Sequence, residues 1–97
     1  MILSLHPLAE AELAEGAAFY AREGGRTLAE AFVAEFGRSA ALLRDCPELG
    51  ARWQGDFRRL PLRRFPYSIV YNPGTRALLI VALAHQSRRP GYWRRRV

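Results

Sequence analysis

Residues 56–96 constrain this chain most, because apolar segments of strand type alternate there with clusters of arginine. Apolar residues recur with a two-residue period over residues 65–71, a turn is expected at residues 72–74, and an apolar run spans residues 77–84. Arginine pairs or triplets flank these segments at positions 58–59, 63–64, 88–89 and 94–96. The pattern predicts an antiparallel hairpin that belongs both to a sheet and to a strongly cationic surface.

The charge of the chain is divided between its two halves. Residues 1–50 contain four arginines and eight acidic residues, whereas residues 51–97 contain eleven arginines and one acidic residue. This excess of positive charge in the second half predicts an anionic partner. The partner could be nucleic acid, an acidic protein surface or an anionic membrane.

The length of 97 residues and an apolar content of 49% predict a single folded domain, residues 1–97. Cys46 is the only cysteine, so no internal disulfide is expected. The N-terminal residues lack a charged leader with an apolar core, and no apolar run approaches the about 20 residues that span a bilayer. We therefore expect a cytoplasmic protein that has no membrane partner.

Two helices are expected after a short strand at residues 2–5. Apolar and small residues recur at helical spacing over residues 9–20, and the glutamates at positions 10, 12 and 15 lie off this stripe and are expected to face water. The pair Gly24-Gly25 ends this helix, because glycine adopts a left-handed backbone without a Cβ clash. A second stripe over residues 28–43 then predicts an antiparallel helix hairpin.

The remaining segments complete an α+β fold of order β-α-α-β-β-β, with the helix hairpin packed on one face of an antiparallel sheet. Residues 48–55 are expected to form a loop, and Pro61 suits an edge strand. Residues 77–84 are apolar at both odd-numbered and even-numbered positions, so both faces of the strand are apolar. That strand is therefore either central and covered on both faces, or it leaves one apolar face open for a partner.

No metal or cofactor site is expected, because two histidines and one cysteine offer no ligand pair at a useful spacing and no glycine-rich phosphate loop occurs. The predicted hairpin instead places residues 63–64 beside His85 and Arg88. Guanidinium groups together with an imidazole and the phenol of Tyr92 suit the cleavage of RNA through its 2′-hydroxyl. They equally suit nucleic-acid binding, an acidic protein partner, or a solvated basic face without chemistry.

The order of the elements, the segment at residues 65–71 and the ending at residues 85–93 resemble the RelE/ParE superfamily of toxins from type II toxin-antitoxin systems. The resemblance covers nearly the whole chain, including the Pro-Glu-Leu-Gly segment at residues 47–50. It implies a small toxin whose apolar and basic surfaces are wrapped by an acidic antitoxin. RelE-like members are ribosome-dependent endoribonucleases that cut mRNA, whereas ParE-like members are associated with inhibition of DNA gyrase.

The positions of the RelE-like nuclease set are only partly retained. Arg59 and Tyr92 match a basic and a tyrosine position of that set, but Ser68 and Pro61 stand where further basic residues would be. The resemblance therefore favours a ParE-like gyrase inhibitor. The alternatives are a ribosome-dependent ribonuclease and a non-toxic basic module that binds nucleic acid. In the ribonuclease, the catalytic residues would be Arg59, Arg64, His85, Arg88 and Tyr92.

In the gyrase inhibitor, two surfaces are expected to bind partners, and the partners are a cognate antitoxin and DNA gyrase. In the ribonuclease, the ribosome and mRNA would replace gyrase. The strand at residues 77–84 would receive an antitoxin segment through Leu79, Val81 and Leu83. Acidic surface would be bound by the arginines of the second half, namely Arg63, Arg64, Arg88, Arg89, Arg94, Arg95 and Arg96.

Overall fold

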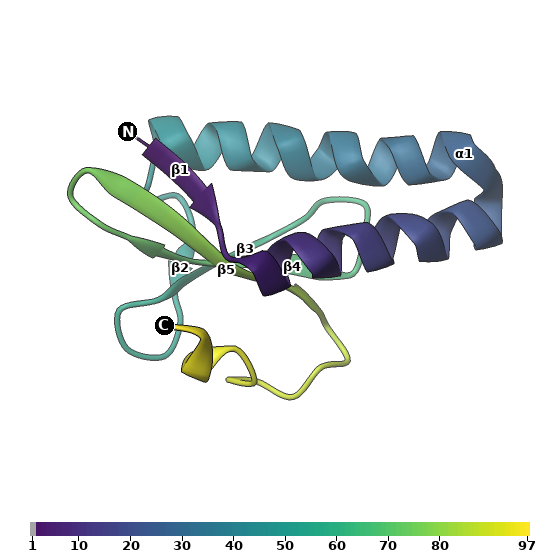
Figure 1. Ribbon diagram of the computed structural model, residues 1–97. Helices are drawn as coiled ribbons and strands as arrows, with labels where there is room; N and C mark the ends of the chain where they lie inside the picture. The colour runs from purple at the N-terminus through teal and green to yellow at the C-terminus, as the bar shows by residue number, and fades with distance from the viewer. Residues whose placement is uncertain (1) are drawn as a thin grey trace.

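The computed structural model describes residues 2–97 and confirms the α+β fold, with the helical layer on one face of the sheet (Figure 1). Within these residues, no helix is both long enough and apolar enough to cross a bilayer. The elements are β1 Ile2–Leu5, α1 Pro7–Asp45, β2 Ala51–Arg52, β3 Arg58–Pro61, β4 Tyr67–Pro73, β5 Ala77–His85 and the short 3-10 helix η1 Arg94–Arg96.

Helix α1 folds back on itself at Gly25, where φ is 83° and ψ is −179°. Glycine adopts this backbone without a Cβ clash, so the predicted position of the break is confirmed. Figure 1 shows the two resulting arms side by side, an N-terminal arm at residues 7–24 and a C-terminal arm at residues 26–45. The first arm begins at His6, whose Nδ1 accepts a hydrogen bond from the Leu8 amide at 3.0 Å.

The strands form one mixed sheet of order β1-β5-β4-β3-β2. Strands β2 to β5 pair antiparallel, but β1 pairs with β5 in parallel, with Ile2 opposite Ala77 and Leu5 opposite Ile80. Two details of the prediction are therefore corrected. The sheet is not wholly antiparallel, and the expected loop at residues 48–55 contains the short edge strand β2, whose two residues pair with β3.

Strand β5 contains a β-bulge at Val81. Val70 of β4 lies opposite Ala82, and the next residue, Tyr71, lies opposite Ile80, so Val81 is an extra residue in the ladder. A bulge shifts the alternation of side chains by one position. Ile80 and Ala82, the neighbours of Val81, therefore point to opposite faces of the sheet, whereas residues two apart in a regular strand point to the same face.

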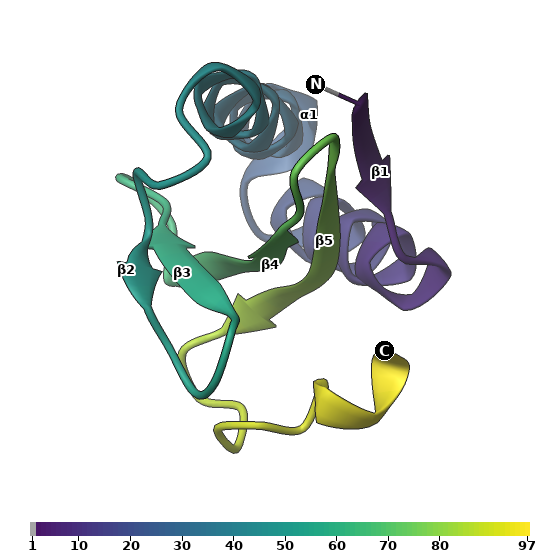
Figure 2. The same ribbon diagram turned by 90° about the vertical axis from the view of Figure 1, so that its left-hand side faces the viewer.

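The two faces of β5 belong to two different apolar clusters. Leu83 joins the main core under α1, whereas Val81 packs against Trp93 on the opposite face, and all three side chains are at most 1% exposed. Trp93 belongs to the C-terminal segment, residues 86–97, which Figure 2 shows on the side of the sheet away from α1. Of the two alternatives for this strand, the structure adopts the central position with cover on both faces.

Leu79, Val81 and Leu83, which were expected to receive an antitoxin segment, therefore do not form one open face in this structure. The bulge turns Leu83 toward α1, and the C-terminal segment covers Val81. Leu79 is half-buried against the smaller cluster. The apolar character of this strand is satisfied within the chain itself.

The main core is built around aromatic rings from both layers. Tyr20 and Phe32 of α1 contact Phe65, with ring centroids 4.9 Å and 5.2 Å from it. Gly16 makes this packing possible, because a Cβ there would lie 2.7 Å from the Phe32 ring. Small residues on one arm thus let the aromatic residues of the other arm reach the sheet.

Tyr71 fixes the segment that links α1 to β2. Its buried hydroxyl donates a hydrogen bond to the Pro47 carbonyl at 2.7 Å and accepts one from the Gly50 amide at 2.9 Å. A Cβ at Gly50 would lie 2.7 Å from this hydroxyl and 2.9 Å from the Arg59 carbonyl oxygen. The segment at residues 47–50 is thus held against β4, and a Cβ at its last residue would be forced against neighbouring atoms.

We predict that Gly50→Ala lowers the free energy of unfolding by about 1 to 3 kcal/mol, because the added methyl group is forced against Tyr71 and the β3 backbone. The control is Gly37→Ala, at an exposed position of the C-terminal arm with nothing within 4 Å of an added Cβ. It should raise the stability by up to about 1 kcal/mol. Urea denaturation of both variants checks this, and equal midpoints would contradict it.

Candidate functional site

A small groove of about 130 Å³ lies on the sheet face away from α1, where the C-terminal segment leaves part of β4 uncovered. We call it the open-face groove. It brings together Arg59, His85, Arg88 and Tyr92, four of the five residues predicted as catalytic for a ribonuclease. The fifth, Arg64, lines a different groove with Glu35.

Two guanidinium groups of the open-face groove are stacked on aromatic rings. The Cζ atom of Arg59 lies 3.8 Å from the ring centroid of Trp53, and that of Arg88 lies 3.9 Å from the ring centroid of Tyr92. Each such contact contributes about 0.5 to 1 kcal/mol at an exposed site. Stacking orients both guanidinium groups, and the one on Arg88 also lies 4.0 Å from the Glu12 carboxylate.

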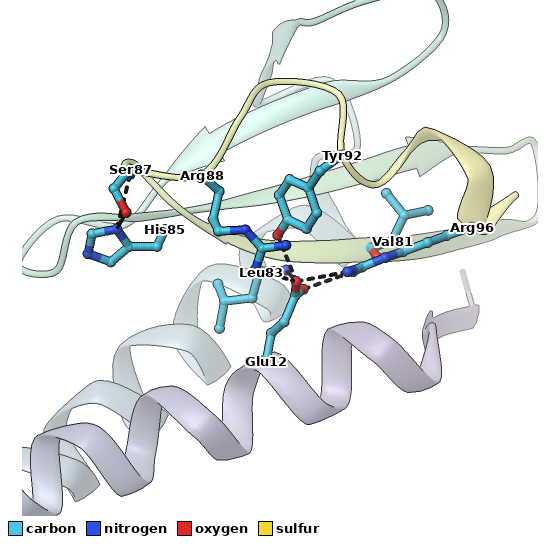
Figure 3. Close-up of polar contacts among 8 residues, drawn as sticks. All are labelled: Glu12, Val81, Leu83, His85, Ser87, Arg88, Tyr92 and Arg96. Carbon is cyan, nitrogen blue, oxygen red and sulfur yellow. Dashed lines mark hydrogen bonds and ion pairs between the residues drawn. The ribbon is translucent and has the colours of Figure 1, made fainter.

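Glu12 connects the N-terminal arm of α1 to the C-terminal segment. Its Oε1 accepts hydrogen bonds from the Leu83 amide at 3.0 Å and from Arg96 at 2.9 Å (Figure 3). Its Oε2 accepts from the Tyr92 hydroxyl at 2.7 Å and from the second Arg96 nitrogen at 2.9 Å. The Arg88 guanidinium lies 4.0 Å away. Glu12 is 8% exposed, so the prediction that it faces water is wrong.

The ion pair between Glu12 and Arg96 completes the edge of β5 beyond the end of β1. The last backbone hydrogen bond from the β1 side reaches the Ile80 carbonyl. Past this point, Arg96 donates to the Val81 carbonyl at 2.9 Å, and Glu12 accepts from the Leu83 amide. Two side chains therefore satisfy backbone groups that a neighbouring strand would otherwise pair.

Hydrogen bonding sets the protonation of this cluster. Burial by itself raises the pKa of Glu12, but hydrogen bonds from Arg96, Tyr92 and the Leu83 amide outweigh it and hold the pKa below its ordinary value. Burial and the neighbouring Glu12 carboxylate raise the pKa of Tyr92 well above that of a free tyrosine. Tyr92 is thus a neutral donor to a carboxylate, which does not suit a general base.

His85 is also restrained. Its Nδ1 accepts a hydrogen bond from the Ser87 amide at 3.0 Å and lies 2.7 Å from the Ser87 hydroxyl. Its ring meets that of Tyr67 edge-on, with centroids 5.0 Å apart. With Nδ1 assigned as an acceptor, the neutral imidazole carries its proton on Nε2. That nitrogen can donate a hydrogen bond, but it cannot accept a proton.

The ends of the central hairpin meet, but their side chains diverge. The Gln86 amide donates to the Pro66 carbonyl at 2.8 Å, so the two strand ends lie side by side as predicted. Residues 63–64, however, line a groove between the C-terminal arm and β3, whereas residues 88–89 line the open-face groove. The predicted cluster of arginines is therefore split between two surfaces.

The terminal arginine triplet is divided as well. Arg94 and Arg95 are exposed, whereas the Arg96 side chain is only 12% exposed and is bound by Glu12 and the Val81 carbonyl. The assignment of Arg96 to an anion-binding surface is therefore wrong, because its positive charge is neutralised inside the fold.

Sequence reasoning missed the two carboxylates that organise these surfaces, Glu12 and Glu35. Glu35 is 6% exposed and accepts hydrogen bonds from the Arg63 amide at 3.1 Å and from Arg38 at 2.9 Å. These bonds, the one from the amide first, lower the pKa of Glu35. Both glutamates border the apolar stripe of their arm, and this position is the one signal in the sequence that separates them from the exposed glutamates.

The helix hairpin on a mixed sheet, with a cationic groove on the opposite face, defines a RelE/ParE-type toxin fold. The solved structure "Chromosomal ParDE TA system from P. aeruginosa" contains a chain with this fold, with a TM-score of 0.77 and 22% identity, covering 88% of this chain and 95% of that one. No significant match is found among curated proteins. The profile of the family described as "ParE toxin of type II toxin-antitoxin system, parDE" matches residues 3–90. The chain therefore belongs to the ParE toxin family, as the resemblance predicted.

We predict that Arg96→Ala lowers the free energy of unfolding by about 3 to 5 kcal/mol, because it leaves a buried carboxylate without its cation. The matched control is Arg95→Ala, the exposed neighbour in the same triplet, which should change stability by less than about 0.5 kcal/mol. Chemical denaturation measures both variants. Similar losses for the two would show that the ion pair does not stabilise the fold.

The stability contributed by Glu12 should depend on pH. A carboxyl group whose pKa is lowered by folding contributes stability that is present above its unfolded pKa and lost as the pH falls through its folded pKa. The difference in unfolding free energy between the native sequence and Glu12→Gln should therefore be largest near neutral pH and shrink as the pH falls below the ordinary value of 4.5. Denaturation between pH 3 and pH 7 tests this, and a difference independent of pH would contradict it.

Proposed function

We propose that this ParE-family chain inhibits growth in the cytoplasm by binding DNA gyrase, and that a cognate antitoxin neutralises it. The observation that carries the proposal is the family match over residues 3–90. ParE-like members of the superfamily are associated with gyrase inhibition. The replacement of basic nuclease positions by Ser68 and Pro61 supports the same side of the superfamily.

The chemistry of the open-face groove also supports binding over catalysis. Neither Tyr92, which donates to Glu12, nor His85, whose Nδ1 is engaged by Ser87, is arranged to accept a proton from a ribose hydroxyl. The stacked guanidinium of Arg88 and the exposed Arg89 suit the carboxylates of an acidic protein surface. A cationic surface that lacks a general base is what we expect of an inhibitor that acts by binding its target.

The target contacts proposed here are exposed arginines of the C-terminal segment. They are exposed and belong to the C-terminal segment, which Figure 2 shows on the side of the sheet away from α1. Because exposed charges act over about 8 Å at physiological salt, binding should weaken as the salt concentration rises. The residues proposed for this role are Arg88, Arg89, Arg94 and Arg95.

A ribosome-dependent ribonuclease is the second candidate, favoured by one observation. Arg59, Arg88, His85 and Tyr92 line the same groove, so two cations could hold a scissile phosphate there. Arg64, predicted for this set, lines the other groove. The third candidate, a non-toxic module that binds nucleic acid, would use the same arginines without any growth effect.

The decisive experiment measures gyrase supercoiling with the purified chain and two double variants. We expect the native chain to inhibit supercoiling, and Arg88→Glu with Arg89→Glu to weaken inhibition by about tenfold or more, because reversed charges repel an acidic surface. The combination of His85→Ala and Tyr92→Phe, which removes the imidazole and the phenol hydroxyl, should inhibit nearly as well as the native chain.

Other outcomes select the alternatives. Cleavage of mRNA on translating ribosomes, abolished by His85→Ala with Tyr92→Phe and accompanied by normal supercoiling, would establish the ribonuclease. Salt-dependent binding to bulk DNA or RNA without a growth defect on expression would establish the non-toxic module, since phosphate contacts lose affinity steeply with salt.

A further inference from the structure

A groove of about 300 Å³ lies between the N-terminal arm of α1, the start of β4 and the end of β5. We call it the Phe19 pocket. Tyr67 and Leu83 of the sheet line it together with residues of the arm and Arg88 of the C-terminal segment. Arg88 also lines the open-face groove, and Figure 3 shows its side chain close to Glu12 of the arm. The Phe19 pocket therefore adjoins the surface that we propose binds the target.

The Phe19 pocket differs in charge from that surface. Glu12 and Glu15 line it with Arg88, whereas three guanidinium groups and no carboxylate line the open-face groove. The Glu12 carboxylate is already bound by Arg96. Glu15 is exposed, and within residues 2–97 it forms no ion pair. Glu15 thus places an unneutralised negative charge beside a strongly positive surface.

Two aromatic rings line the same pocket. Phe19 is 45% exposed, and its ring meets that of Tyr20 edge-on, with centroids 5.1 Å apart. Tyr67 is half-buried, and its hydroxyl lies against the arm, where a Cβ at Gly16 would be 3.3 Å away. A cation is attracted to the face of an aromatic ring, and arginine makes this contact more often than lysine. The rings and the Glu15 carboxylate therefore favour the same kind of ligand.

The Tyr67 hydroxyl is available to that ligand. Within the part of the chain that the structure describes, it forms no hydrogen bond, unlike the hydroxyls of Tyr71 and Tyr92. Burial raises the pKa of Tyr67, and the ionisable groups of Tyr20 and Glu15 raise it further. The hydroxyl is therefore neutral at neutral pH, and its oxygen can accept a hydrogen bond from an N–H group.

We propose that the Phe19 pocket receives a basic side chain of DNA gyrase, beside the acidic residues that bind Arg88 and Arg89. Glu15 neutralises this side chain, the Phe19 ring stacks on it, and the Tyr67 hydroxyl accepts one of its N–H groups. Arginine suits the pocket best, because a guanidinium combines a planar face with several donors. The inference rests on the proposed function and deepens it, since it takes the occupant to be gyrase.

A change of sign within one surface also restricts which proteins can bind. A target that is acidic throughout would bring a carboxylate against Glu15, and like charges in contact weaken binding. A target with one basic residue among acidic ones avoids this repulsion and gains an ion pair. Glu15 would therefore fix the orientation of the target and exclude surfaces that merely carry negative charge.

The first test reverses the charge of Glu15 and measures inhibition of gyrase supercoiling by the purified chain. Glu15→Lys should require at least about tenfold more protein for half-maximal inhibition, because it repels the basic side chain. The matched control is Glu23→Lys, the same change at an exposed glutamate of the same arm, which should inhibit as the native chain does. A target that is acidic throughout predicts the opposite sign, so stronger inhibition by Glu15→Lys would overturn the inference.

The second test removes the exposed ring. Phe19→Ala should weaken inhibition by about threefold to tenfold, because the cation loses its aromatic contact. Val33→Ala, which truncates an exposed apolar residue of the C-terminal arm, is the control and should leave inhibition unchanged. All four substituted side chains are exposed, so the variants should remain folded at the assay temperature, and urea denaturation checks this.

The outcomes separate this inference from the proposed function. A native chain that leaves supercoiling untouched overturns both. An inhibitory native chain with unchanged inhibition by Glu15→Lys or Phe19→Ala overturns only the inference. If Glu15→Lys inhibits normally but escapes neutralisation by the protein that restores growth on co-expression, the pocket belongs to the antitoxin. If Glu15→Lys inhibits normally but abolishes a self-association of the chain, the pocket belongs to a second copy. Either result overturns the assignment to gyrase.

Discussion

The buried ion pair between Glu12 and Arg96 decides how the two ends of this small fold are joined. It connects the N-terminal arm of α1 to the last helical turn, and it also satisfies two backbone groups at the edge of β5 where β1 has ended. The C-terminal segment held in this way carries Trp93 onto the second face of the sheet. Without that cover, the central strand would expose an apolar face, so the ion pair indirectly determines which surfaces remain for partners.

Arginine has three separate roles in this chain, and only one of them is binding at a surface. Arg96 and Arg58 are structural, because each donates hydrogen bonds to backbone carbonyls within the fold. Arg59 and Arg88 are stacked on aromatic rings and so are oriented toward the open-face groove. Arg63 and Arg64 are exposed and line a groove together with Leu60. The charge asymmetry of the sequence therefore does not predict any single surface. Some guanidinium groups bind backbone carbonyls inside the fold, some stack on aromatic rings, and others are exposed at the surface.

Local patterns in the sequence predicted the elements, and long-range contacts explain where prediction failed. The break at Gly25 and the alternation in β4 follow from backbone conformation and side-chain period, which are properties of neighbouring residues. The bulge at Val81 inverts the faces of β5 without any mark in an unbroken apolar run, so the strand's cover was misassigned. Glu12 was placed in water because its partners follow it by 71 to 84 residues, a separation that no periodicity reveals. The side chains that decide the site are therefore those set by tertiary contacts.

Two grooves divide the positive charge of the chain between opposite sides of the sheet. Arg63 and Arg64 line a groove beside the C-terminal arm of α1, whereas Arg88 and Arg89 line the open-face groove. The molecule is 21 Å across in its shortest dimension, and exposed charges are screened over about 8 Å at physiological salt. Acidic residues on one side therefore only weakly neutralise arginines on the other, so a partner that neutralises both surfaces must contact both sides of the sheet.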